Sequence, residues 1–104
     1  MDWYTGKIID SIVHRFRYGI KEVRDIQEIS MIDYTKENID KLSDILKKGN
    51  YDQIQSLKPP KDLLGEDITI IRFRDQDEKS YYAFYYDSIE LNQSPVVLEV
   101  FPNV

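Results

Sequence analysis

The fold is decided by three stretches in the second half of the chain: DITIIRFR at residues 67–74, SYYAFYYD at residues 80–87 and VVLEVF at residues 96–101. All three are rich in β-branched and aromatic residues, which are favoured in β-strands. Polar residues separate them, and we expect a tight turn at residues 75–79 and a longer loop at residues 88–95. The pattern predicts a three-stranded antiparallel β-meander.

Alternation within each strand indicates which face of the sheet is buried, because successive side chains point to opposite faces. The third stretch has one side that is wholly apolar: Val96, Leu98 and Val100. In the second stretch the bulkier apolar set is Tyr82, Phe84 and Tyr86. In the first stretch, Ile71 and Phe73 then point inward. The predicted outer face carries Arg72, Arg74, Tyr81, Tyr85 and Glu99.

The register that fits this assignment places Phe73 opposite Tyr82 and Ile71 opposite Phe84. A slip of one residue would reverse the two faces of any one strand, because the side-chain period is two. On the outer face, a guanidinium group can lie over a phenol ring and pair with a carboxylate. The outer face is therefore a candidate binding surface.

The first half of the chain predicts helices. Apolar residues recur at helical spacing from Tyr4 to Ile26, which favours one long helix from about Tyr4 to about Ser30. Gly19 lies inside this stretch and leaves a kink or a break open. A second helix is predicted over Lys36–Lys48.

Residues around the second helix indicate where it starts and stops. Thr35 is its predicted N-cap, and Gly49 is the residue that ends it. Asn50 can cap a short third helix, after which two adjacent prolines predict an extended crossover to the sheet. The predicted fold is α+β: N-terminal helices, one long, one medium and one short, pack on one face of the C-terminal three-stranded antiparallel meander. Residues 1–104 are expected to form a single domain.

Composition excludes several kinds of protein. The chain has no cysteine, which removes disulfides and thiolate chemistry. Its longest apolar run, residues 81–86, is far shorter than the ~20 residues that a membrane-spanning helix needs. The first residues lack the basic and apolar segments of a signal peptide. We therefore expect a cytoplasmic protein that does not bind membranes.

Charge predicts the kind of partner. The formal net charge is −5, and residues 58–104 hold five Lys/Arg against nine Asp/Glu, whereas residues 1–57 hold nine against ten. An acidic surface repels nucleic acid and favours basic partners. We expect no nucleic-acid binding, although Arg72 and Arg74 beside aromatic residues are typical of a single-strand platform. Modest acidity can also serve solubility alone.

The search for catalytic and metal-binding motifs is negative. The only histidine, His14, has one acidic residue a turn before it and no further ligands in the sequence. With four glycines in the chain and no glycine-rich phosphate motif, nucleotide binding has little sequence support. We predict no cofactor and no enzymatic activity.

The turn at residues 75–79 holds three carboxylates, which resembles part of a calcium loop. The calcium loop of an EF-hand needs glycine at its sixth position and glutamate at its twelfth, and counted from Asp75 these positions are Ser80 and Tyr86. The following stretch also predicts a strand rather than a helix. We therefore predict an exposed acidic turn and no metal.

Protein binding is the function that remains. Tyrosine and arginine are enriched at interface hot spots, and acids around them would speed the capture of a basic protein. We hypothesise a non-catalytic binding module of the immunity or inhibitor type, which neutralises a basic toxin or nuclease. Its candidate partner-binding residues are Arg72, Arg74, Tyr81, Tyr85, Glu99, Asp75, Asp77, Glu78, Asp87 and Glu90. The alternatives are a self-associating structural or regulatory subunit, as a homodimer through the long helix, and an enzyme without a recognisable motif.

Overall fold

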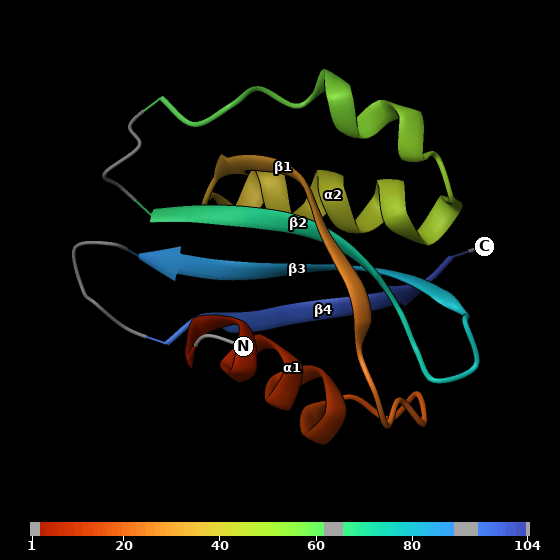
Figure 1. Ribbon diagram of the computed structural model, residues 1–104. Coiled ribbons are helices and arrows are strands. Elements are labelled where there is room, and N and C mark those ends of the chain that lie inside the picture. The colour runs from red at the N-terminus through yellow and green to blue at the C-terminus, as the bar shows by residue number, and fades with distance from the viewer. Residues whose placement is uncertain (1–2, 62–65, 89–93, 104) are drawn as a thin grey trace.

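The computed structural model describes residues 3–61, 66–88 and 94–103. In chain order the elements are helix α1 (Trp3–Arg15), strand β1 (Arg24–Asp33), helix α2 (Lys36–Lys48), 3-10 helix η1 (Tyr51–Ser56) and strands β2 (Glu66–Arg74), β3 (Ser80–Ser88) and β4 (Val96–Pro102). The strands form one antiparallel sheet in the order β1-β2-β3-β4 (Figure 1). The α+β class and the three strands of the meander are confirmed. The sheet, however, has four strands rather than three.

The predicted long helix is wrong beyond Arg15. Helix α1 ends there, and Arg24–Asp33 forms strand β1, which pairs with β2. Gly19 lies between the two elements with a φ of 71°, a left-handed conformation that cannot continue a right-handed helix. The apolar residues of this segment are also compatible with a strand. Pairing with β1 satisfies the backbone N–H and C=O groups along the edge of β2.

Helix α2 begins and ends at the predicted residues. The Thr35 hydroxyl accepts a hydrogen bond from the backbone N–H of Asn38 at 3.1 Å. Gly49 has a φ of 73°, and its N–H donates to the carbonyl of Ile45. The short third helix is the 3-10 helix η1. Asn50 precedes it without a side-chain capping bond, so the predicted cap at Asn50 is wrong.

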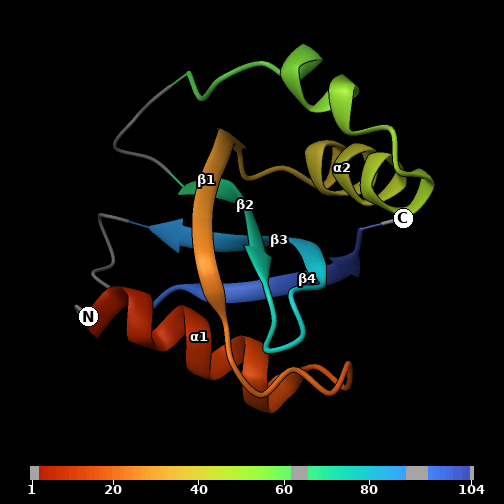
Figure 2. The same ribbon diagram turned by 45° about the vertical axis from the view of Figure 1, so that its right-hand side comes forward.

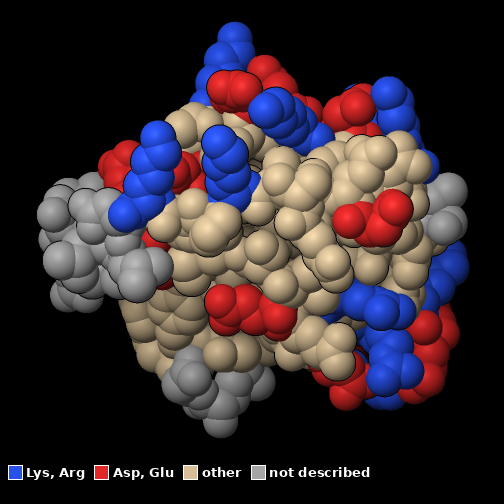
Figure 3. All heavy atoms as spheres, turned by 90° about the horizontal axis from the view of Figure 1, so that it is seen from above, with Lys and Arg blue, Asp and Glu red and all other residues tan. Residues whose placement is uncertain are grey.

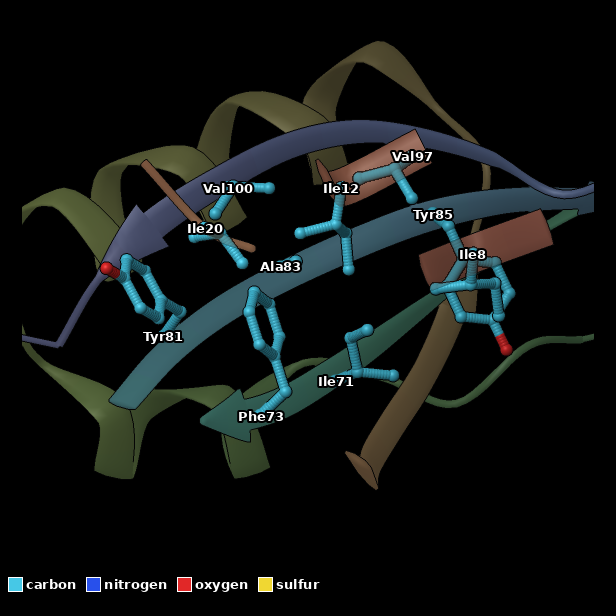
Figure 4. Packing of buried hydrophobic residues seen from close by; sticks show 10 residues of the cluster. All are labelled: Ile8, Ile12, Ile20, Ile71, Phe73, Tyr81, Ala83, Tyr85, Val97 and Val100. Atoms are coloured by element: carbon cyan, nitrogen blue, oxygen red, sulfur yellow. The ribbon is translucent and has the colours of Figure 1, made fainter. Parts of the chain in front are cut away.

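Helices cover both faces of the sheet, so the prediction of one covered face is wrong. Figure 1 shows α1 on one side of the sheet and α2 with η1 on the other. The buried cluster on the α1 side is drawn in Figure 4 and consists of Ile8, Ile12, Ile20, Ile71, Phe73, Tyr81, Ala83, Tyr85, Val97 and Val100. The cluster on the α2 side consists of Ile32, Leu42, Ile45, Leu46, Ile54, Ile68, Ile70, Tyr82, Phe84 and Phe101. The sheet is the middle of three layers.

The register between β2 and β3 differs from the prediction by one residue. Phe73 pairs with Tyr81 rather than with Tyr82 across the turn at residues 75–79. Tyr81 and Tyr85, predicted to lie outside, are therefore buried against α1 with exposures of 4% and 6%. Aromatic residues occupy both sides of this strand, and alternation does not reveal the register when both faces are buried.

An irregularity in β4 changes its faces. The pairing with β3 shifts between Glu99 and Val97, which leaves Leu98 as an extra residue. Val97 and Val100 consequently face the α1 side, while Leu98 packs against the α2-side cluster. The prediction that Val96, Leu98 and Val100 share one side is wrong, because a bulge interrupts the alternation.

Strand β1 lies at an edge of the sheet and is irregular. Its register shifts between Arg24 and Gln27 and again between Glu28 and Ser30. Figure 2 shows β1 running beside β2 and at a steep angle to β3 and β4. Bulges and strong twist disfavour pairing of an edge with another strand. This edge is poorly suited to adding a strand from a second molecule.

The turn between β2 and β3 holds the segment that precedes β1. Gln76 Oε1 accepts from the backbone N–H of Lys21 at 3.0 Å, and Gln76 Nε2 donates to the carbonyl of Gly19 at 3.0 Å. Gln76 Oε1 also accepts from the backbone N–H of Glu22 at 3.4 Å. Gln76→Ala is expected to lower the free energy of unfolding by about 1 kcal/mol, because all three bonds are lost at an exposed site. Urea denaturation measures the change. Gln55→Ala, at an exposed position of η1, is the control, and an equal effect in both variants would contradict the assigned role of Gln76.

Candidate functional site

Only part of the predicted binding surface comes together. Arg72 and Arg74 are exposed on the α2 side of β2, at the end of the sheet that carries the β2–β3 turn. Tyr81 and Tyr85 lie on the opposite side, against α1. The predicted contact between these tyrosines and the arginines is therefore wrong. The tyrosine that lies beside Arg72 is Tyr82, its partner in the pairing of β2 with β3.

The predicted acidic residues are spread over the molecule. Asp77 and Glu78 are exposed in the β2–β3 turn, and Glu99 is exposed on β4. Asp87 is half-buried near the other end of β3. Glu90 lies outside the described residues. Of the predicted acids, only Asp77 and Glu78 are exposed in the turn near the arginines.

Asp75 holds the β2–β3 turn together, and its predicted exposure is wrong. Only 3% of the residue is exposed. Its Oδ1 accepts from the backbone N–H groups of Asp77 at 2.8 Å and Lys79 at 3.0 Å, and its Oδ2 accepts from the Tyr81 hydroxyl at 3.0 Å. Burial acts to raise the pKa of Asp75, but these hydrogen bonds outweigh it and keep the pKa below its ordinary value. Burial and the bond to Asp75 raise the pKa of Tyr81 to about 12.

Two arginines at the turn end of the sheet are paired with carboxylates. Arg74 lies 2.7 Å from Asp25 Oδ2 and 3.6 Å from Glu78 Oε2. Arg24 lies 2.7 Å from Glu22 Oε2. Asp25 and Glu78 have φ values of 53° and 65°, in the left-handed region that side chains other than glycine rarely adopt. Both carboxylates on Arg74 are thus presented from unusual backbone conformations.

Arg72 has an aromatic partner instead. Its Cζ lies 6.0 Å from the centroid of the Tyr82 ring. The Tyr82 ring stacks on that of Tyr51, with centroids 4.2 Å apart and planes 15° apart. Within the described part of the chain, no ion pair includes Arg72. The guanidinium group therefore keeps hydrogen-bond donors for a further partner.

The opposite end of the sheet is acidic. Asp33 of β1, Asp67 of β2 and Asp87 of β3 are direct neighbours across the three strands, and Glu66 begins β2. Like charges that face each other across strands destabilise a sheet. The ion pairs between described residues include neither Asp33, Glu66 nor Asp87. This end of the sheet therefore concentrates acidic side chains from three neighbouring strands.

Exposed apolar side chains adjoin these acids. Tyr34 and Val96 are 40% and 38% exposed. The Tyr34 ring lies 4.6 Å from that of Tyr86, which pairs with Val96. The Tyr86 hydroxyl donates to Glu66 Oε1 at 2.9 Å, and the Tyr34 N–H donates to the Glu66 carbonyl at 3.1 Å. We call this end of the sheet the acidic end and define it as Asp33, Tyr34, Glu66, Tyr86, Asp87 and Val96. Tyr86 and Val96 lie on the α2 side of the sheet, and Asp87 lies on the α1 side.

Neutral phenols border the acidic end on the α1 side. The Tyr4 and Tyr85 rings meet edge to face, with centroids 5.9 Å apart. Burial, followed by hydrogen bonding to Asp87 and Tyr85, raises the pKa of Tyr4 well above its ordinary value. Burial also raises the pKa of Tyr85. Both hydroxyl groups therefore remain protonated at physiological pH and provide no phenolate base or nucleophile.

Sequence reasoning did not place Tyr34, Glu66, Tyr86 and Val96 together. One signal was present: Glu66 precedes one predicted strand and Asp87 ends the next, and an antiparallel pair brings such positions to the same end. Tyr34 follows β1, however, and most of β1 lies in the segment that the sequence predicted as the end of the long helix. Its position beside Tyr86 depends on the pairing of β1 with β2.

Within residues 3–61, 66–88 and 94–103, no three His, Asp or Glu side chains lie close enough to share a metal ion. In the same ranges, no helix has the length and apolar character needed to span a membrane. No protein-family model, curated protein or solved structure matches the chain at a significant level.

Proposed function

We propose that this protein is a non-catalytic binding module that captures a basic protein partner through the acidic end. Its role would be that of an immunity or inhibitor protein, which neutralises a toxin or nuclease. One observation carries the proposal: the exposed Tyr34 ring packs on the half-buried Tyr86, whose hydroxyl donates to Glu66. Glu66, and Asp33 and Asp87 at the same end of the sheet, form no ion pair with described residues.

The chemistry of this surface suits a Lys or Arg side chain of the partner. A guanidinium or ammonium group can lie against the face of Tyr34 or Tyr86 and donate hydrogen bonds to Glu66. Tyrosine is enriched at interface hot spots, because it buries a large area while its hydroxyl remains bonded. A cation would also offset the repulsion among the acids. The exposed apolar area and the charge therefore favour the same class of partner.

Charge over the molecule supports a basic protein rather than a nucleic acid. The net charge is −5. Figure 3 looks down on the α2 side and shows Lys and Arg side chains standing mostly beside Asp and Glu around the margins, with a largely uncharged centre. Binding to phosphate backbones requires a continuous positive surface. The mixed charges on this face do not provide one.

The alternative of a homodimer through a long N-terminal helix has less structural support than capture of a basic partner. The predicted helix would have continued past Arg17 and Lys21, but α1 ends at Arg15 and Arg24 begins β1. The free edge of β1 carries two register shifts, which disfavour strand pairing between molecules. Neither feature offers a regular surface for self-association.

Affinity capture from the source organism, or co-purification with the product of the adjacent gene, tests the proposal. The expected result is a basic protein whose toxic or nuclease activity falls in proportion to the amount of complex formed. Recovery of an acidic protein, or of no protein at micromolar concentrations, would contradict the proposed function. So would a complex in which the partner keeps full activity.

Removing three charges from the acidic end is expected to slow association. The triple variant Asp33→Asn, Glu66→Gln and Asp87→Asn keeps the side-chain shapes. Its association rate with the basic partner should fall about tenfold at low salt, because surface charges steer encounter. The rate should also depend less on ionic strength. Surface plasmon resonance measures both effects.

A matched control separates the acidic end from net charge. The variant Asp10→Asn, Asp40→Asn and Asp52→Asn removes the same charge from three exposed positions on helices. Its association rate should stay within about twofold of the unmodified protein, since steering depends on where charge lies relative to the interface. Equal slowing in both triple variants would show that only net charge matters and would remove the acidic end from the proposal.

A further inference from the structure

We infer that the hollow at the turn end of the sheet is a binding site for a carboxylate group, held by the guanidinium of Arg72. The hollow has a volume of about 300 Å³, and the polar side chains that line it are Asp25, Gln27, Arg72, Arg74, Glu78 and Ser80. It lies at the other end of the strands from the acidic end. The inference therefore does not rest on the proposed function.

Three side chains that line the hollow can donate hydrogen bonds to a ligand. Among the described residues, no side-chain hydrogen bond or ion pair is made by Gln27, Arg72 or Ser80. Their groups differ in kind: a primary amide, a guanidinium fork and a hydroxyl. All three can donate to an oxygen atom. All three donors can therefore bind a ligand that has two adjacent acceptor oxygens.

An aromatic contact restricts where the Arg72 guanidinium can lie. Its Cζ lies over the Tyr82 ring, 6.0 Å from the centroid, and Tyr82 is 8% exposed and stacked on Tyr51. A guanidinium held by its face against a ring keeps its N–H edges free. Those edges match the two oxygens of a carboxylate, and a pre-positioned fork loses less conformational entropy on binding than a free side chain.

The neighbouring charges favour a carboxylate over a phosphate. Arg74 already has two carboxylates, Asp25 at 2.7 Å and Glu78 at 3.6 Å, so its charge is offset within the protein. Among the described residues, Arg72 is the cation of the hollow that is in no ion pair. Two arginines and two carboxylates give the hollow no net formal charge, so a ligand with one negative charge meets less repulsion than a ligand with two. A phosphate monoester carries more negative charge and would be repelled by Asp25 and Glu78.

The size of the hollow limits the ligand. A volume of about 300 Å³ is at the lower end of the range for small-molecule sites. It can hold one short acidic group, such as the side chain of a glutamate in a peptide or a free dicarboxylate of similar length. Either ligand would place a carboxylate against Arg72, and the titration described next distinguishes the peptide from the free acid.

Titration of ¹⁵N-labelled full-length protein, followed by NMR, tests the site. The probes are glutarate, the blocked tripeptide acetyl-Ala-Glu-Ala-amide, its glutamine counterpart and inorganic phosphate. Saturable shifts are expected at the Arg72 Nε–H and at the backbone amides of Gln27 and Ser80 with glutarate, the glutamate peptide or both. The glutamine peptide and phosphate should bind at least about tenfold more weakly.

Variants decide whether Arg72 holds the ligand. Arg72→Lys keeps the charge but lacks the fork, and it should weaken binding at least about tenfold. Arg24→Lys is the matched control, since Arg24 is exposed, pairs with Glu22 and does not line the hollow. It should leave binding unchanged. The spectrum of each variant shows directly whether the fold is kept, and Ser80→Ala provides a second variant of the hollow.

Each result of the titration either assigns the ligand or overturns the inference. Binding of glutarate alone assigns a small acid, and binding of the glutamate peptide assigns an acidic segment of a protein. No saturable shift with either probe would overturn the inference, as would tighter binding of phosphate or equal binding by Arg72→Lys and the unmodified protein. The triple variant of the acidic end should still bind the carboxylate probe, so failure of the proposed function would leave this result intact.

Discussion

Replacing Phe84 by alanine is expected to lower the free energy of unfolding by about 3–5 kcal/mol. Phe84 is fully buried in the α2-side cluster, where its ring lies 6.4 Å from that of Phe101. The loss combines the transfer free energy of the ring with the cost of the cavity left behind. Urea denaturation monitored by circular dichroism measures it.

Phe73→Ala is expected to cost a similar amount, about 3–5 kcal/mol, although Phe73 lies on the other side of the sheet. Its ring is fully buried and stacks on Tyr81, with centroids 5.3 Å apart. Only a sheet covered on both faces produces two losses of this size. Val96→Ala, at a site that is 38% exposed, is the control and should cost under about 1 kcal/mol. A loss below about 1 kcal/mol at either phenylalanine would mean that its face of the sheet is not core.

Asp75→Ala should lower the free energy of unfolding by about 3 kcal/mol, because one buried acceptor serves three donors. Without it, the backbone N–H groups of Asp77 and Lys79 and the hydroxyl of Tyr81 lose their partner. Asp77→Ala removes an exposed acid from the same turn and should stay within about 0.5 kcal/mol of the unmodified protein. Equal losses in the two variants would contradict the structural role of Asp75.

The contribution of Asp75 should also depend on pH. Burial acts to raise its pKa, but its hydrogen bonds keep the folded-state pKa below that of the unfolded chain, about 3.9. A depressed folded-state pKa means that the ionised carboxylate stabilises the fold above the unfolded pKa. This stability is lost as pH falls through the folded-state value. The difference in stability between the unmodified protein and Asp75→Ala should therefore narrow below about pH 4. A difference that stays constant down to about pH 2 would contradict the assignment.

Local signals in the sequence predicted the elements that need only neighbouring residues. Helix α2 follows from the Thr35 cap, its apolar stripe and the left-handed Gly49, all within one short segment. The three strands of the meander follow from runs of β-branched and aromatic residues bounded by turns. Exposure of Arg72 and Arg74 was also predictable, because each interrupts an apolar strand.

The candidate site was less predictable, because both faces of the sheet are buried. In β3, tyrosine occurs on either side of the strand, so alternation could not tell Tyr82 from Tyr81 and Tyr85. The pairing of Arg72 with Tyr82 follows from a register that the structure sets one residue away from the expected one. Asp75 was expected at the surface because its acceptor role depends on Tyr81, which lies beyond the turn.

The sequence by itself determined that this chain forms helix α2 and a C-terminal antiparallel meander with an acidic, cysteine-free composition. Only the tertiary structure decided the state of residues 24–33, whose apolar spacing suits a helix or a strand. They form β1 because the edge of β2, some forty residues later in the chain, supplies hydrogen-bond partners. The left-handed Gly19, between α1 and β1, also prevents one continuous helix. The acidic end depends on that choice, since β1 brings Asp33 and Tyr34 beside Asp67 and Tyr86.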